Sequence, residues 1–250
     1  MASTLFPKEH LDEGDIKEGL RTLAWDGIYV QTMGVFTTGA FLIGFALALG
    51  ASNSVIGILS ALGPLALIMQ LPAVYLVKRF RYRKFILVIT TVIGRTVWFV
   101  IPALPFFLPK DWLLPAFLGS LMVHYIAGNI GTCAFNSWIR DLIPDQLLGA
   151  FFARRLALST AASALLSLAG GFGIDWWKAH LSHWPGAELG GYAVIFAIAA
   201  AAGLMSTYYL YRTPEPRIPS DTGEGYFASI RQPLRDHNFR QLLIFLGSWN

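Results

Sequence analysis

Between Asp26 and Lys78 the chain contains no Asp, Glu, Lys or Arg, and only the small turn Gly50–Asn53 interrupts its apolar sequence. A water-soluble domain would expose part of such a stretch to solvent, where a long apolar run is not stable. Two helices that cross a bilayer account for it, because a helix needs about 20 apolar residues to span ~30 Å of hydrocarbon. The sequence therefore predicts an integral membrane protein.

The rest of the sequence repeats this pattern in four further apolar runs. Together the runs predict six membrane-crossing helices, at residues 26–49, 54–77, 85–107, 112–138, 156–177 and 192–211. Hydrophobic residues make up 55% of the chain and the mean hydropathy is +0.53, in agreement with this content. We predict an all-α fold, a six-helix transmembrane bundle over residues 26–212 built as two repeats of three helices.

The distribution of basic residues predicts the orientation. Most of the 19 Lys and Arg residues lie before the first span, between spans two and three, between spans four and five, or after span six. Because short loops rich in Lys and Arg remain in the cytoplasm, both ends of the bundle sequence are predicted to be cytoplasmic, in a multi-pass protein of the inner (plasma) membrane. The same bias explains the net charge of +4 without a nucleic-acid partner.

The segments outside the six spans define three further regions. Residues 1–25 mix acidic and basic side chains and form a predicted cytoplasmic segment without a cleavable signal. Residues 213–240 begin with a Pro- and Gly-rich stretch and form a predicted cytoplasmic central linker. The apolar run at 241–250 is too short to cross a membrane, so we expect it to be the start of a truncated seventh span, with a second six-helix half beyond it.

Polar residues inside the spans follow helical faces. Gln31 lies on one face of span one, and Asn129 and Asn136 lie on one face of span four. Such faces turn away from lipid, either for hydrogen bonds between helices or to line a cavity. Spans one and four hold equivalent places in the two repeats, which favours a cavity. The candidate substrate-cavity residues are Gln31, Arg95, His124, Asn129 and Asn136.

Three ionisable side chains of the predicted spans are candidates for a functional role. Arg95 is close to the middle of span three, where a guanidinium costs roughly 2.5 to 3.5 kcal/mol, so it is either a structural anchor or a binding group for substrate. His124 is either a proton relay or a packing residue. Asp26 is a proton carrier, a cation ligand or, most simply, a helix cap.

A second set of charged residues is expected to act at a gate or interface: Asp26, Arg79, Arg83, Lys84, Arg140, Asp141 and Arg155. In span five, the small residues Ser159, Ser163, Ser167 and Gly171 repeat every fourth position and predict a packing seam. No catalytic residue, cofactor site or metal site is predicted. Cys133 has no partner cysteine, and His180 with His183 among tryptophans indicates an interfacial belt.

The arrangement resembles the amino-terminal half of a major facilitator superfamily transporter. Residues 76–84 (LVKRFRYRK) are similar to the family's loop motif G-x-L-x-D-R-x-G-R-R-K, with Lys78 at the acidic position. The matching residues are Leu76, Arg79, Arg83 and Lys84. Residues 136–155 also resemble the connection between spans four and five of bacterial members. The resemblance implies secondary active transport of a small solute by alternating access, with no enzymatic activity, and His124 suggests proton coupling.

Two other functions remain open at this point. Asp141 and Asp145 have the D-x-x-x-D spacing of a magnesium-dependent prenyl-type transferase embedded in the membrane, although Pro144 breaks the helical register between them. A six-span permease subunit of an ATP-driven transporter would also fit the span count. No Walker-type motif occurs in the chain.

Overall fold

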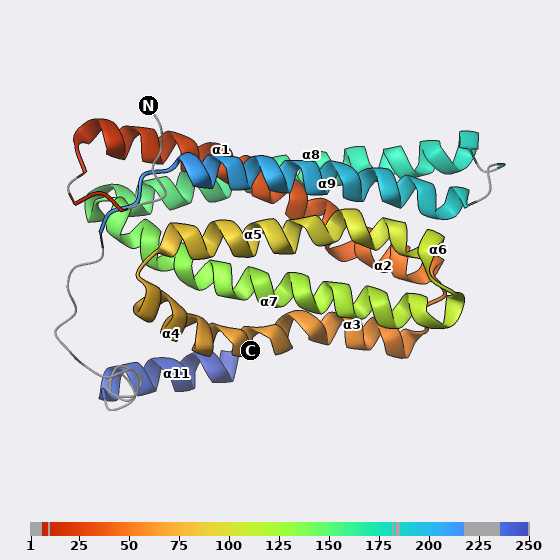
Figure 1. The fold of residues 1–250 in the computed structure, drawn as a ribbon, viewed down its shortest axis with the longest axis horizontal. Helices are drawn as coiled ribbons and strands as arrows, with labels where there is room; N and C mark the ends of the chain where they lie inside the picture. Colours follow the sequence, from red (N-terminus) through yellow and green to blue (C-terminus); the bar gives the residue numbers. More distant parts are fainter. Residues whose placement is uncertain (1–6, 10, 182, 184–185, 218–235, 250) are drawn as a thin grey trace. The chain divides into compact units, whose positions relative to one another are not determined.

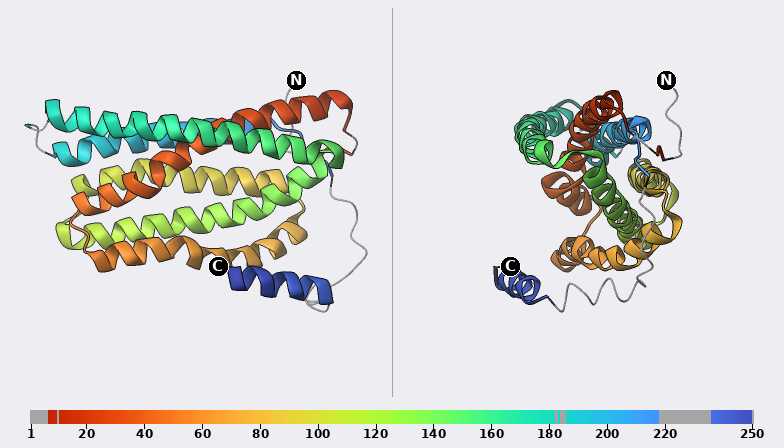
Figure 2. Two further views of the ribbon diagram at one scale, coloured as in Figure 1. Left: turned by 180° about the vertical axis from the view of Figure 1, so that it is seen from behind. Right: turned by 90° about the vertical axis from the view of Figure 1, so that its left-hand side faces the viewer.

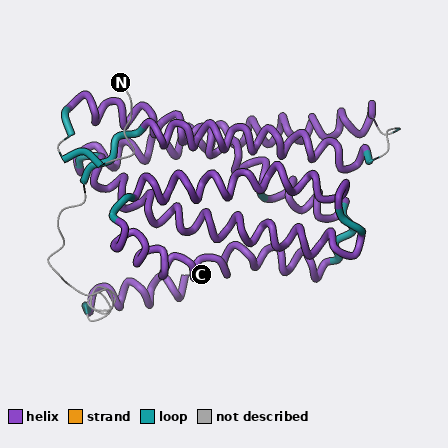
Figure 3. Tube along the Cα trace, viewed as in Figure 1, coloured by secondary structure: helices purple, strands orange, loops and turns teal. Residues whose placement is uncertain are grey.

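The structure, a computed structural model, describes residues 7–9, 11–181, 183, 186–217 and 236–249. Nearly all of these residues are helical, and the only extended pairing recorded among them is an isolated bridge between Lys8 and Pro216 (Figure 3). The chain divides into two units, residues 1–217 and 218–250, which are described separately below. The all-α prediction is confirmed.

Six helical stretches in the first unit are long and apolar enough to span a membrane. They comprise α1 (Glu13–Thr37) with α2 (Gly39–Ala48); α3 (Asn53–Ala66), η1 (Leu67–Met69) and α4 (Gln70–Phe80); α5 (Arg83–Val100), η2 (Ile101–Ala103) and α6 (Leu104–Phe107); α7 (Lys110–Leu142); α8 (Asp145–Leu181); and α9 (Ala187–Arg212). The six predicted spans are thereby confirmed. The helices extend beyond several predicted limits, most clearly at α1, which begins at Glu13 rather than near Asp26.

Local sequence explains where the spans begin and break. Asp12 caps α1 by accepting a hydrogen bond from the backbone N–H of Asp15 at 2.6 Å, within a capping box. α1 and α2 are separated at Thr38, and α2 begins with Gly39 at φ +56°, a conformation that few other residues adopt without strain. In span two, the 3-10 turn η1 lies between Pro64 and Pro72, where the proline at 72 removes a helical donor.

The first unit is a bundle whose spans alternate in direction (Figure 1). Helix α9 packs against α1, α5 and α8, while α7 packs against α5, α3 and α4. The two further views in Figure 2 show α1, α8 and α9 running side by side. The loops rich in Lys and Arg therefore lie at one end of the bundle, together with the start of α1 and the end of α9.

Two groups of buried side chains fill the bundle. The larger one is rich in aromatic rings: Phe45, Trp98 and Phe117 are fully buried around Phe196, and Phe45 meets Phe196 edge to face with 5.1 Å between ring centroids. Edge-to-face pairs of this kind stabilise beyond their buried area, by about 0.5 to 1.5 kcal/mol. The smaller group lies nearer the basic loops and is centred on Trp138.

The predicted seam on α8 contacts the bundle only in its first half, where Ser163 bonds to Gln31 of α1. Ser167 is exposed, and a Cβ atom added at Gly171 would meet nothing within 4 Å. Gly170 is buried instead, against the rings of Phe36 and Phe41. The predicted seam is therefore wrong over its second half, because the helical phase places Gly170 rather than its neighbour against α1 and α2.

The second unit contains α11 (His237–Trp249) in its described part. Asp236 caps this helix, since its carboxylate accepts hydrogen bonds from the backbone N–H groups of Asn238 at 2.8 Å and Phe239 at 3.0 Å. The helix includes the apolar run predicted to start a seventh span. Residues 218–235 of the predicted linker lie outside the described residues.

Substitution of the two adjacent glycines tests the packing of α8. A Cβ at Gly170 would lie 2.6 Å from Cζ of Phe41 and 2.8 Å from Cε1 of Phe36, so Gly170→Ala should destabilise the protein by about 1 to 3 kcal/mol. Gly171→Ala is the matched control and should be neutral or stabilising by up to about 1 kcal/mol, because alanine favours the helix. Thermal unfolding in detergent measures both. Equal melting temperatures for the two variants would contradict the observed helical phase.

Candidate functional site

A pocket of about 360 Å³ lies among α1, α5, α7, α8 and α9, inside the membrane-spanning region. Two buried charged side chains, Asp26 and Arg95, lie in its walls. The polar lining residues are Asp26, Thr90, Thr91, Arg95, His124, Thr132, Asn136 and Arg155. Three of the predicted cavity residues and two of the predicted gate residues thus line one space.

Asp26 lies in the middle of α1 and is only 2% exposed. Its Oδ2 accepts a hydrogen bond from Nη2 of Arg155 at 2.9 Å, and its Oδ1 accepts one from the hydroxyl of Ser206. The helix-cap interpretation of Asp26 is wrong, because α1 begins more than three turns earlier, at Glu13. The carboxylate instead joins α1 to α8 and α9 through a buried ion pair.

Arg155 reaches the pocket from α8 because α1 has a glycine at the crossing. A Cβ at Gly27 would lie 2.8 Å from Nε of Arg155, so only glycine leaves room for this side chain. The guanidinium carbon lies 5.4 Å from the ring centroid of Phe135, a favourable cation–π distance. Its Nη1 is buried and has no hydrogen-bond partner among the described residues.

Arg95 reaches across from α5 to α9 and is 6% exposed. Its Nη1 donates to the backbone carbonyl of Gly203 at 2.5 Å and to the hydroxyl of Thr207. Glycine is needed here too, because a Cβ at position 203 would lie 3.0 Å from Cγ of Arg95 and 2.6 Å from Sδ of Met33. The structure thus anchors one nitrogen of Arg95 while the residue lines the pocket.

His124 is held on the same wall by α5. Its Nδ1 lies 2.8 Å from the carbonyl oxygen of Gly94 and 3.2 Å from Nε1 of Trp98, whose ring meets the imidazole edge to face. Depending on the tautomer of the ring, Nδ1 either donates a hydrogen bond to the carbonyl of Gly94 or accepts one from Nε1 of Trp98. Asn136 lies further along α7 and is exposed at the same pocket.

The two other predicted cavity residues connect helices away from this pocket. Gln31 donates a hydrogen bond to the hydroxyl of Ser163 at 2.5 Å, joining α1 to α8. Asn129 accepts one from Gln70 at 3.0 Å and donates to the carbonyl of Tyr125 at 2.9 Å. Both arrangements correspond to the alternative in which polar faces form bonds between helices.

A second charged cluster closes the end of the bundle that carries the basic loops. Arg83 is fully buried and pairs with Asp141, and its Nη1 also donates to the carbonyl of Ser137 at 3.0 Å. The backbone N–H of Arg83 donates to Oε1 of Glu215 at 2.8 Å. Lys84 is buried beside it, with its ammonium 5.4 Å from the ring centroid of Tyr211. Arg79 and Arg140 are exposed.

Glu215 follows α9 and is buried within this cluster. Burial raises the pKa of its carboxyl above the usual range, because desolvation outweighs the hydrogen bonds from the backbone of Lys84 and Arg83 and the positive charge of Arg83. The neighbouring Pro214 carbonyl accepts a hydrogen bond from Nε1 of Trp138 at 3.0 Å. The first residues of the predicted flexible linker are therefore fixed to α5 and α7.

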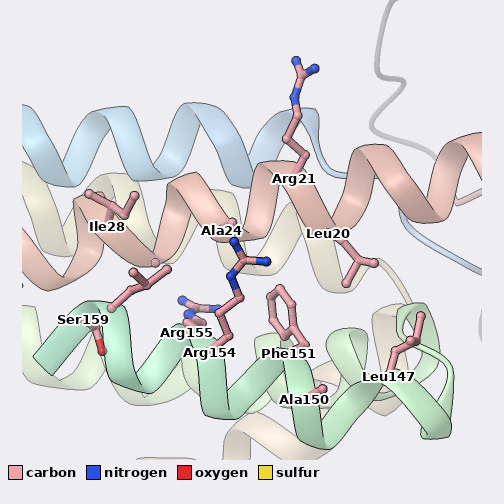
Figure 4. A pocket seen from close by; sticks show the side chains of 12 residues that line it. Leu20, Arg21, Ala24, Ile28, Leu147, Ala150, Phe151, Arg154, Arg155 and Ser159 are labelled. Atoms are coloured by element: carbon pink, nitrogen blue, oxygen red, sulfur yellow. The ribbon is translucent and has the colours of Figure 1, made fainter. Parts of the chain in front are cut away.

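A larger groove of about 470 Å³ lies between α1 and α8 (Figure 4). Its lining is mainly apolar, with Leu20, Ile28 and Phe151 among its side chains. Arg21 and Arg154 stand at its exposed edge, and Arg155 belongs both to this groove and to the polar pocket. Helix α8 therefore separates an apolar groove from a charged pocket at the position of Arg155.

Sequence reasoning missed the residues that hold the charged side chains. In span six it singled out none, although Ser206 and Thr207 form a polar pair in an otherwise apolar helix and Gly203 lies one turn earlier. That spacing was the available signal, because residues four apart share a face. Glu215 was missed as an acid between two prolines. No group of three His, Cys, Asp or Glu side chains that could hold a metal occurs in the described part of the chain.

The sequence matches a family profile described as Major Facilitator Superfamily over residues 27–249. The chain belongs to the major facilitator superfamily. No curated protein and no solved structure matches it significantly. The resemblance found in the loop and span pattern is thereby confirmed.

This membership makes the chain a secondary transporter of a solute across a membrane, in a family of transporters rather than enzymes. It supports secondary transport better than either alternative, the prenyl-type transferase or the permease subunit of an ATP-driven transporter. The D-x-x-x-D acids are also separated in role, since Asp141 pairs with Arg83 while Asp145 begins α8.

Proposed function

We propose that the pocket lined by Asp26, Arg95, His124, Asn136 and Arg155 is the solute site of an alternating-access carrier. The observation that carries this proposal is the concentration of charged and polar groups in one pocket within helices that otherwise face lipid or apolar core. A polar side chain that only bonds one helix to another does not need a pocket beside it. Here the pairing residues and the pocket coincide.

The cluster of Arg83, Asp141 and Glu215 acts in this proposal as a gate element at the cytoplasmic end. It joins the start of α5, the end of α7 and the segment after α9 through buried and partly buried hydrogen bonds. Such a cluster lets these elements move as one body when the unit rocks. Alternating access also requires a second six-helix unit, and α8, the least buried of the six spans, offers a face for it.

Proton coupling belongs to the same proposal. Asp26 and His124 are the carboxyl and the imidazole of the pocket lining, the groups there that are suited to exchange a proton. Both lie beside arginines that would respond to a change in their charge. A proton bound or lost at either residue would therefore change how the pocket holds a charged or polar solute.

The uptake assay uses the intact protein in liposomes, screened with labelled sugars, amino acids and carboxylic acids under an imposed proton gradient of either direction. A solute that accumulates above the level in protein-free liposomes is then tested with Arg95→Ala. We expect this variant to lose uptake by at least tenfold per folded molecule, because the anchored guanidinium is removed from the pocket.

Arg95→Lys should restore uptake only in part, since an ammonium cannot reproduce the planar donor arrangement of arginine. Protein recovered from membranes after gel filtration gives the number of folded molecules. Normal uptake per folded molecule in Arg95→Ala would remove Arg95 from the solute site. Absence of gradient-dependent accumulation for every solute would contradict the coupled mechanism.

The orientation is proposed from the basic loops, which the structure gathers at one end of the bundle. A reporter enzyme that works only in the cytoplasm should be active when it is fused after Arg217. A reporter that works only outside the inner membrane should be active when it is inserted after Gly186. The first site follows α9 at the basic end, and the second precedes it at the opposite end. Reversed activities would invert the proposed topology.

A further inference from the structure

The ionisable groups in the pocket lining do not balance. The lining contains two guanidinium groups, from Arg95 and Arg155, and one carboxylate, from Asp26. Asp26 forms its ion pair with Arg155. The hydrogen-bond acceptors of Arg95 are both uncharged, a backbone carbonyl and the hydroxyl of Thr207.

The unmatched charge belongs to a side chain with unused donors. All recorded hydrogen bonds of Arg95 leave from Nη1, so within the described residues Nε and Nη2 donate to no protein acceptor. These two nitrogens are also not among the fully enclosed atoms that lack partners, so they are accessible at the pocket that Arg95 lines. Nε and Nη2 form the edge of a guanidinium that binds two oxygens of one oxyanion.

A purely structural role does not explain this arrangement. An anchor between α5 and α9 needs only a neutral donor that reaches the carbonyl of Gly203, whereas a guanidinium in hydrocarbon adds a cost of several kcal/mol when uncompensated. An anion that enters the pocket would supply the missing negative charge. The charge would then be balanced in the loaded state.

We propose that the solute is a small organic anion, and that its carboxylate binds Nε and Nη2 of Arg95 in a bidentate pair. Asn136 and Thr132, exposed at the pocket on α7, offer polar contacts for the remainder of the molecule. The Asp26–Arg155 pair remains closed and contributes no net charge. This proposal rests on the pocket being the solute site.

The electrostatic part is tested without knowledge of the solute. Cys133→Ser removes the single native thiol, and Thr132→Cys introduces a new one at the pocket. The rates of modification by 2-sulfonatoethyl methanethiosulfonate, an anion, and by the 2-(trimethylammonium)ethyl reagent, a cation, are measured on the intact protein. Their ratio is divided by the ratio for the same reagents with mercaptoethanol in solution.

A positive pocket should favour the anionic reagent by about tenfold over the solution reference, the effect expected for one full charge several ångströms away in water. Arg95→Gln should abolish this preference, and Arg95→Lys should retain it. Lys110→Gln removes the same charge from an exposed position at the start of α7 and should leave the ratio unchanged. A wild-type ratio equal to the solution reference would overturn the proposal, and this comparison requires no Arg95 variant to fold.

The solutes found in the uptake screen provide the second test. We expect carboxylates to accumulate and to protect the introduced thiol, and their amides, such as lactamide beside lactate, to do neither. Accumulation of an uncharged solute alone would overturn the anion proposal while the transport function stands. If no solute accumulates, the transport proposal fails, whereas the reagent ratio still reports the charge of the pocket.

Discussion

The buried ion pair between Asp26 and Arg155 is the interaction on which the arrangement of this bundle depends. An unpaired carboxylate or guanidinium in a membrane interior costs several kcal/mol, so each of these two side chains stabilises the other. The pair joins α1 to α8, and Ser206 adds α9 to the same site. Glycine at position 27 makes the crossing possible, because any larger residue would displace Arg155.

The rest of the unit is organised around this charged layer. On one side, the aromatic group around Phe45 and Phe196 packs the helices mainly through ring contacts. On the other, the cluster of Arg83, Asp141 and Glu215 fixes the loops at the basic end. The pocket and the charged layer lie between these two packed regions. A change in the charge of the pocket would therefore act on helices that are well packed at both ends.

The sequence was sufficient for the fold and for part of the site. Length and absence of charge specified the six spans, because the bilayer restricts spanning segments to a narrow range. The same cost argument identified Arg95 and His124 as interior residues. It could not assign the partners of the charged residues, because Thr207 beside Arg95 and Ser206 beside Asp26 are neutral residues whose contacts depend on how α9 is rotated against α5 and α1.

Helical phase explains the remaining differences. A spacing of four residues, as at Ser159, Ser163 and Gly171, places small residues along one side of α8 but does not show that this side is the packed one. The contacts of Gly170 with Phe36 and Phe41 show which side is packed in the second half of the helix. Asp26 was read as a cap because the charge-free run begins after it, whereas α1 starts at Glu13 with its own cap. Apolar composition indicates where a helix crosses lipid, and a helix can extend well beyond that stretch.

A double-mutant cycle at Asp26 and Arg155 tests the central claim most directly. Asp26→Asn, Arg155→Gln and the double variant are compared with the wild type by reversible unfolding in mixed micelles. If the pair organises the bundle, each single change should cost roughly 3 to 5 kcal/mol and the double change little more than either, which gives a coupling energy of about 3 kcal/mol. Additive losses within about 0.5 kcal/mol would show that the two side chains act independently and would contradict the account.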